Sequence, residues 1–267
     1  MPLENLVFSL YANMALLAVA AGYVLARHGG IISREFEKIN RATLLAIALV
    51  FFLALFLRVF VAPQQYELFV AETSFAEAGK NLLLNGQPLM QCHYVAAEKA
   101  ECIVAQAGHI AFPVFLSAVF FFFGTGPAVA SNALLVLGAL TPVLVFFIAY
   151  LLFRSSAIGL WSALLLALNP IHLTWSNAAS VDIASAFFVC LAILLLLICI
   201  RLEKRSLLIL FSLSLSFSLQ FRPENFLLIL PIATLAGSKW LETPHHAKAL
   251  PRIRRALPAL LLFAVLA

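Results

Sequence analysis

Three charged residues that lie far apart in the chain are of types that serve in acid–base catalysis and in anion binding. Glu72 stands in a long polar segment, Asp182 follows "NPIHLTWSNAASV", and Arg222 opens the stretch "RPEN". A carboxylate within reach of a hydroxyl can take its proton as the oxygen attacks, and Glu72 and Asp182 are the candidates for that base. The planar guanidinium of Arg222 can bind two phosphate oxygens and offset the charge of a leaving group. These residue types suit proton transfer and the binding of an anionic group.

Each of these residues also has a purely structural interpretation. Asp182, the only aspartate of the chain, and Glu224 can end helices at the water interface at little energetic cost. Arg222 can form an ion pair with either carboxylate instead of binding phosphate. If the three segments that carry Glu72, Asp182 and Arg222 lie on the same membrane face, the functional interpretation is favoured.

The segment around Glu72 also has the pattern of an amphipathic interfacial helix. In "AETSFAEAGKNLLLNG" the residues Glu72, Glu77 and Lys80 would form its wet face. The residues that would enter lipid on the opposite face are Phe75, Leu82 and Leu83. Lys80 is in addition a weaker candidate for contact with a phosphate.

Other residues could contact a ligand or a metal ion. Trp175 and Tyr94 can stack on a ring of a ligand, although the aromatic belt of a membrane protein is the better explanation. His109 is a candidate substrate contact. A divalent metal could be held by His109 together with His93, Glu98 and Glu101. Their spacing matches no tight ligand motif, so no cofactor is assigned.

The four cysteines divide into two pairs. Cys190 and Cys199 lie inside an apolar run, where a thiol behaves as a small hydrophobe. Cys92 and Cys102 lie in a polar loop, where a disulfide can form if the loop faces an oxidising compartment. The spacing of two thiols does not decide whether they bond.

The composition indicates a membrane protein built of helices. Of the 267 residues 64% are hydrophobic and 11% are charged, and the mean hydropathy is +1.04, whereas soluble domains have about 25% charged residues. Apolar runs of about 20 residues cross a bilayer as helices, and a transmembrane barrel would show short alternating strands instead. The first run has no basic residue before it, so we expect a retained span instead of a signal peptide.

The basic residues predict how the apolar runs cross the membrane. Runs lie at about 5–26, 43–62, 109–123, 129–153, 157–175, 183–200, 206–221, 225–240 and from 256 onward. Thirteen of the seventeen Lys and Arg residues lie in the connectors at 27–41, 154, 201–205 and 239–255, which the positive-inside rule places in the cytoplasm. These connectors share one side only if the run at 109–123, which contains Pro113, lies along the outer boundary without crossing.

We therefore expect an all-α polytopic protein with about eight transmembrane helices and juxtamembrane helices in its first large external loop. Three regions follow: two N-terminal helices with a basic cytoplasmic loop (1–62), the external loop (63–128) and a helix bundle (129–267). Because the last apolar run stops with the chain, we expect the bundle to be truncated. The basic connector at 239–255 would meet anionic lipid headgroups. The net charge of +5 does not indicate a nucleic-acid partner, since it reflects these connectors.

The order of several motifs resembles the GT-C membrane glycosyltransferases, in particular the protein-mannosyltransferase and aminoarabinose-transferase-like group (glycosyltransferase family 39-like). The loop "AETSFAEAGKNLLLNGQP" is similar to the family's first external loop, and a Pro-containing juxtamembrane helix that ends in Phe-Gly follows. The matching residues are Glu72, Phe75, Ala78, Gly86, Pro113, Phe123 and Gly124. "ALLLALNPIHLTWSNAASVD" is similar to the next outward helix with its second acid, and "LQFRPENFLLILP" to an Arg-Pro-Glu element. These similarities cover roughly residues 60–235.

Two departures from the family pattern matter. Ala71 precedes Glu72, where the family usually has an Asp, so Glu72 or Glu67 would have to supply the loop carboxylate. Family members also run several hundred residues longer than this chain.

The resemblance implies transfer of a sugar, with a hexose such as mannose as the default, from a polyprenyl-phosphate (dolichyl or undecaprenyl) donor. The acceptor would be a protein, lipid or glycan on the external face, and the displacement would invert the sugar. Glu72 and Asp182 would be catalytic, and the substrate contacts would be Arg222, Glu224, Lys80, His109 and Trp175. We expect the plasma membrane of a prokaryote. The alternatives are a transporter or lipid-sugar flippase, or a scaffold without activity.

Overall fold

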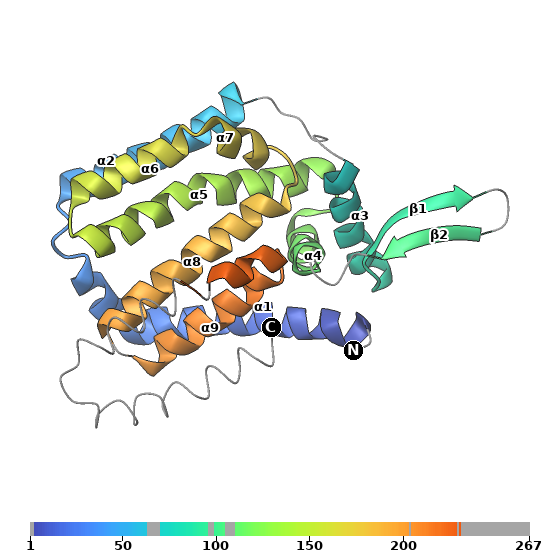
Figure 1. The fold of residues 1–267 in the computed structure, drawn as a ribbon, viewed down its shortest axis with the longest axis horizontal. Coiled ribbons are helices and arrows are strands. Elements are labelled where there is room, and N and C mark those ends of the chain that lie inside the picture. The colour runs from blue at the N-terminus through green and yellow to red at the C-terminus, as the bar shows by residue number, and fades with distance from the viewer. Residues whose placement is uncertain are drawn as a thin grey trace.

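A bundle of helices makes up most of the computed structural model, which describes residues 3–62, 70–95, 99–104, 110–202, 204–228 and 230 (Figure 1). The longer helices are α1 (Leu3–Glu35), α2 (Arg41–Phe56), α5 (Pro127–Phe153), α6 (Ser156–Ala167), α8 (Val181–Leu202) and α9 (Arg205–Leu219). Three short elements continue them: the π-helical η1 (Leu57–Val61) after α2, α7 (Pro170–Ser176) after α6, and the 3-10 helix η3 (Pro223–Leu228) after α9. Between η1 and α5 lie α3 (Val70–Asn85), β1 (Leu89–Val95), β2 (Lys99–Val104) and α4 (Ala111–Phe123).

Side-chain caps begin several of these helices where the sequence provides Asn or Ser. Asn40 accepts a hydrogen bond from the backbone N–H of Thr43 at the start of α2, and Ser155 accepts one from Ile158 at the start of α6. Asn169 does the same for α7, whose first residue is Pro170. A capped N–H and a proline in the first turn both remove donors that would otherwise lack a partner.

The helices form a layered bundle with α5 in its middle (Figure 1). On one side α5 packs against α6 and α2, and on the other it packs against α8. Beyond α8 come α9 and then α1, which packs against α9. The first and last long helices of the described chain therefore lie side by side.

Four helices of the described part are long and apolar enough to cross a membrane. They are Val7–Glu35, Arg41–Val61, Ala128–Phe153 and Val181–Leu202. The run predicted at 157–175 is broken into α6 and α7, which are bent by 60° and could count as a fifth span. The two runs expected after residue 224 lie mostly outside the described residues, and α9 is a shorter apolar helix. A multi-pass helical protein is confirmed, with four or five spans described where we had predicted eight.

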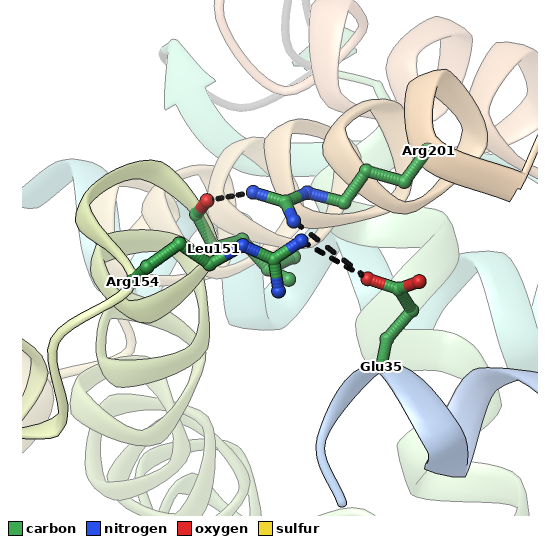
Figure 2. Close-up of polar contacts among 4 residues, drawn as sticks. All are labelled: Glu35, Leu151, Arg154 and Arg201. Atoms are coloured by element: carbon green, nitrogen blue, oxygen red, sulfur yellow. Dashed lines mark hydrogen bonds and ion pairs between the residues drawn. The ribbon is translucent and has the colours of Figure 1, made fainter. Parts of the chain in front are cut away.

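An ion-pair cluster joins three helices at one end of the bundle, which we call the basic end (Figure 2). Glu35 Oε2 at the end of α1 lies 3.4 Å from Arg154 Nη2 and 3.6 Å from Arg201 Nη1. Arg201 also donates a hydrogen bond to the carbonyl of Leu151. The ends of α1, α5 and α8 therefore meet, which agrees with the prediction that these basic connectors share one side.

The opposite end, the loop end, carries α3, α4, the two strands and the starts of α1, α5 and α8 (Figure 1). β1 and β2 form an antiparallel hairpin beside α3, which the sequence analysis did not predict. Its register places Cys92 opposite Cys102 and His93 opposite Glu101. Whether the two cysteines form a disulfide stays a prediction.

Aromatic packing holds α3 and α4 to the bundle at the loop end. Phe75 of α3 contacts Phe112 of α4, with ring centroids 5.7 Å apart, and Leu82 is buried in the same cluster with Leu83 packed against it. An amphipathic helix was predicted here and is present. Part of its apolar face packs on α4, and whether the helix also contacts lipid, as the interfacial interpretation has it, stays a prediction.

Candidate active site

Asp182 and Arg222, which stand forty residues apart in the chain, form an ion pair at the loop end. Arg222 Nη2 lies 2.5 Å from Asp182 Oδ1, and the side chains are 33% and 47% exposed. Asp182 is in the first turn of α8, where the unpaired N–H groups of the helix favour a negative charge. Both side chains are partly exposed, so a ligand could reach both groups.

The turn that carries Arg222 is held from both directions. Phe221 is fully buried and its ring stacks on Phe188 of α8, with centroids 5.3 Å apart. On the other side Asn225 donates hydrogen bonds to Ser185 and to the carbonyl of Ser218. Asn225 was not among the residues that the sequence singled out. Its position three residues after Arg222 was the available signal, since such residues share a face in a helical turn.

A chain of aromatic rings connects this turn to α3, the helix that carries Glu72. Phe112 of α4 contacts Phe221, with centroids 6.2 Å apart, and Phe75 of α3 contacts Phe112. Glu72 lies near the start of α3, but its side chain falls outside the described residues. The backbone therefore brings the elements of Glu72, Asp182 and Arg222 around one aromatic cluster.

Three further candidates lie in the described part of the loop end. Lys80 is exposed on α3, and Glu224 is exposed on η3. Trp175 of α7 is half-buried and packs against the buried hydrophobic cluster that includes Phe112 and Phe221, which fits a structural role.

The remaining candidates are not described. His109 and Glu98 lie outside the described residues, as do the side chains of His93, Tyr94 and Glu101. Among the described residues no group of three His, Cys, Asp or Glu side chains could hold a metal. Whether His109, His93, Glu98 and Glu101 could hold a divalent metal, which the sequence left open, therefore stays untested.

A buried arginine that the sequence analysis passed over lies at the loop end of α2. Arg58 is fully buried in η1, donates from Nη1 to the carbonyl of Ala54 (2.8 Å), and has Nη2 2.6 Å from His172 Nδ1. Asn177 donates to the carbonyls of Arg58 and Ala62. The sequence did contain a signal for this site, because Arg58 stands inside the apolar run 43–62. A cation in such a run is costly and so requires specific partners. These contacts tie η1 to α7 and to the turn before α8.

The fold and this arrangement define a multi-pass helical membrane protein with a charged site at one end of its bundle. The model of the dolichyl-phosphate-mannose-protein mannosyltransferase family matches residues 115–257. This match spans more than half of the chain, and the chain belongs to this family. No curated protein and no solved structure matches it.

Family membership confirms the resemblance found in the sequence. The chain is a membrane glycosyltransferase that uses a sugar donor linked to a polyprenyl phosphate, as members of this family use dolichyl-phosphate-mannose. The matched segment begins in α4 and contains Asp182, Arg222 and Glu224, whereas Glu72 and Lys80 precede it. The family match gives no support to the transporter or flippase that we had kept as an alternative.

Proposed function

We propose that the chain transfers a mannosyl residue from a polyprenyl-phosphate donor to a hydroxyl group of a protein at the loop end of the bundle. The observation that carries this proposal is the Asp182–Arg222 ion pair, which lies within the segment matched by the family model. The family name supports mannose and a protein acceptor.

Arg222 binds the donor phosphate in this proposal. Its Nε is buried without a hydrogen-bond partner among the described residues, while Nη2 is held by Asp182. A guanidinium fixed at one edge keeps its other N–H groups oriented, so it can bind phosphate oxygens with little further loss of side-chain freedom. The developing charge on the leaving phosphate is then offset by a group that is already in place.

Asp182 and Glu72 take different roles. Asp182 is engaged by Arg222, so we assign to it the orientation of that guanidinium, and Glu72 becomes the base. The acceptor oxygen attacks the anomeric carbon and gives its proton to the Glu72 carboxylate. The bond from the anomeric carbon to the phosphate oxygen breaks, and polyprenyl phosphate leaves with the electron pair. One direct displacement inverts the anomeric centre.

We further propose that the loop end faces the outside of a prokaryotic plasma membrane and that the chain crosses it eight times. The grouping of Arg154 and Arg201 at the opposite end supports this orientation through the positive-inside rule.

Transfer of radiolabelled mannose from a polyprenyl-phosphate donor to protein, in membranes that contain the full chain, tests the assignment. Glu72→Gln should lower the transfer rate by about 10²-fold or more, because a positioned base contributes about 10²–10⁴. Glu77→Gln, an exposed position of the same helix, is the matched control and should keep the rate. Equal rates for the two variants would refute Glu72 as the base.

A further inference from the structure

Asn225 joins three elements next to Arg222. Its Nδ2 donates a hydrogen bond to Ser185 Oγ at 2.8 Å and another to the carbonyl of Ser218 at 2.7 Å. A carboxamide nitrogen carries two hydrogens, so both are used here. Ser185 belongs to α8 and Ser218 to the last turn of α9, and one side chain therefore ties η3 to both helices.

The contact to Ser185 runs beside the ion pair of the site. Asp182 and Ser185 are three residues apart on α8, and Arg222 and Asn225 are three residues apart on the facing turn. Two parallel contacts therefore connect the same two segments. The ion pair is partly exposed, and such pairs contribute little by themselves. Ser185 is only 6% exposed, so the second contact is shielded from competing water.

The contact to Ser218 completes the end of α9. The last four carbonyl groups of a helix have no partner within it, and Ser218 is fully buried. The Ser218 carbonyl also accepts the backbone N–H of Phe221 at 3.2 Å, so without the amide of Asn225 it would lose the shorter of these two bonds. Losing a hydrogen bond in an apolar surrounding costs more than losing an exposed one. The turn with Arg222 would then be held to α8 mainly by the stacking of Phe221 on Phe188 and by the partly exposed ion pair, and its position would be less well defined.

We propose that Asn225 is a positioning residue for donor binding: it holds the turn so that the Arg222 guanidinium stays beside Asp182 in the orientation that receives the donor phosphate. The proposal rests on the role given to Arg222 under the proposed function. Asn225 acts through Arg222 and does not itself touch the donor.

Steady-state transfer by the full chain in lipid nanodiscs tests this role. Asn225→Leu keeps the approximate volume and removes both donors, and the KM for the polyprenyl-phosphate sugar should rise roughly tenfold, the usual effect of losing a buried hydrogen bond. The KM for the acceptor should stay near wild type, whereas kcat should fall together with the rise in donor KM, because Arg222 also offsets the charge that develops on the leaving phosphate. Ser185→Ala removes one of the two hydrogen bonds of Asn225, so it should raise the donor KM by a smaller factor. This variant also tests the positioning role if Asn225→Leu does not fold. The control is Leu227→Ala, an exposed position of the same turn.

Arg222→Gln separates failure of this inference from failure of the proposed function. If Arg222→Gln raises the donor KM and Asn225→Leu does not, Asn225 has no positioning role and the role of Arg222 stands. If neither variant changes the donor KM, the phosphate role of Arg222 is wrong as well. In the Arg222→Gln background, Asn225→Leu should add nothing, and a further rise would show that Asn225 does not act through Arg222.

Discussion

At the scale of single residues, Arg58 shows how a buried charge can be held without an acidic partner. Within the described residues no carboxylate lies within ion-pair distance of its guanidinium, which instead bonds to a carbonyl and to His172. A hydrogen bond to a charged group contributes more than one between neutral groups. The neutral imidazole of His172 therefore stabilises the Arg58 guanidinium, which is buried away from water.

We expect His172→Leu to lower the free energy of unfolding by about 1.5–3 kcal/mol, since a buried guanidinium would lose a partner. Thermal unfolding in detergent micelles measures the change. Thr174→Ala is the control, because the one bond of the Thr174 hydroxyl within the described part of the chain goes to the carbonyl of Pro170 in its own helix.

Combining Arg58→Met with His172→Leu should destabilise less than the sum of the single variants, because no buried charge is then left unsupported. A His172→Leu protein with the melting temperature of the wild type would contradict this account of Arg58.

At the scale of elements, the contact between α3 and α4 positions the helix of Glu72. Gly79 lies against α4, and a Cβ at this position would stand 2.8 Å from Leu116 Cβ and 3.2 Å from the carbonyl oxygen of Pro113. No side chain fits between the helices there. Small residues that let two backbones approach are a usual device of helix packing in membranes.

Gly79→Ala should push α3 away from α4 and so displace Glu72. Overpacking of this kind destabilises by about 1–3 kcal/mol, and we expect both a lower melting temperature and a lower rate of mannosyl transfer. Gly22→Ala in α1 is the control, since a Cβ there meets nothing within 4 Å. If Gly79→Ala melts and transfers like Gly22→Ala, the close approach of α3 and α4 is not required.

At the scale of the whole molecule, two groups of charged side chains lie at opposite ends of the bundle. The ends of α1, α5 and α8 meet at the basic end, and Asp182 and Arg222 pair at the loop end. Moving either set across the hydrocarbon core would cost several kcal/mol per charge. The arrangement therefore restricts the bundle to two orientations, of which the positive-inside rule favours one.

Labelling of single cysteines with a membrane-impermeant maleimide tests that orientation. In a background without the four native cysteines, Lys80→Cys should react in intact cells, and Arg154→Cys and Lys204→Cys only after permeabilisation. The reverse pattern would place the loop end in the cytoplasm. Reaction of all three positions from outside would mean that the basic connectors do not share one side.

The sequence by itself determined the class of the protein, most of its helices, the grouping of its basic ends and the resemblance to its family. These properties follow from the cost of placing polar groups in hydrocarbon, which each segment meets on its own. It also identified Asp182 and Arg222 as candidates, because charges beside apolar runs are conspicuous.

Only the tertiary structure decided which partners these residues have. The pairing of Asp182 with Arg222, the bonds of Asn225, the burial of Arg58 against His172 and the packing of α3 on α4 all join segments distant in the chain. Such contacts depend on how the helices pack and where they bend, as between α6 and α7. Uniformly apolar helices carry little periodic signal for the face that each one turns to its neighbour.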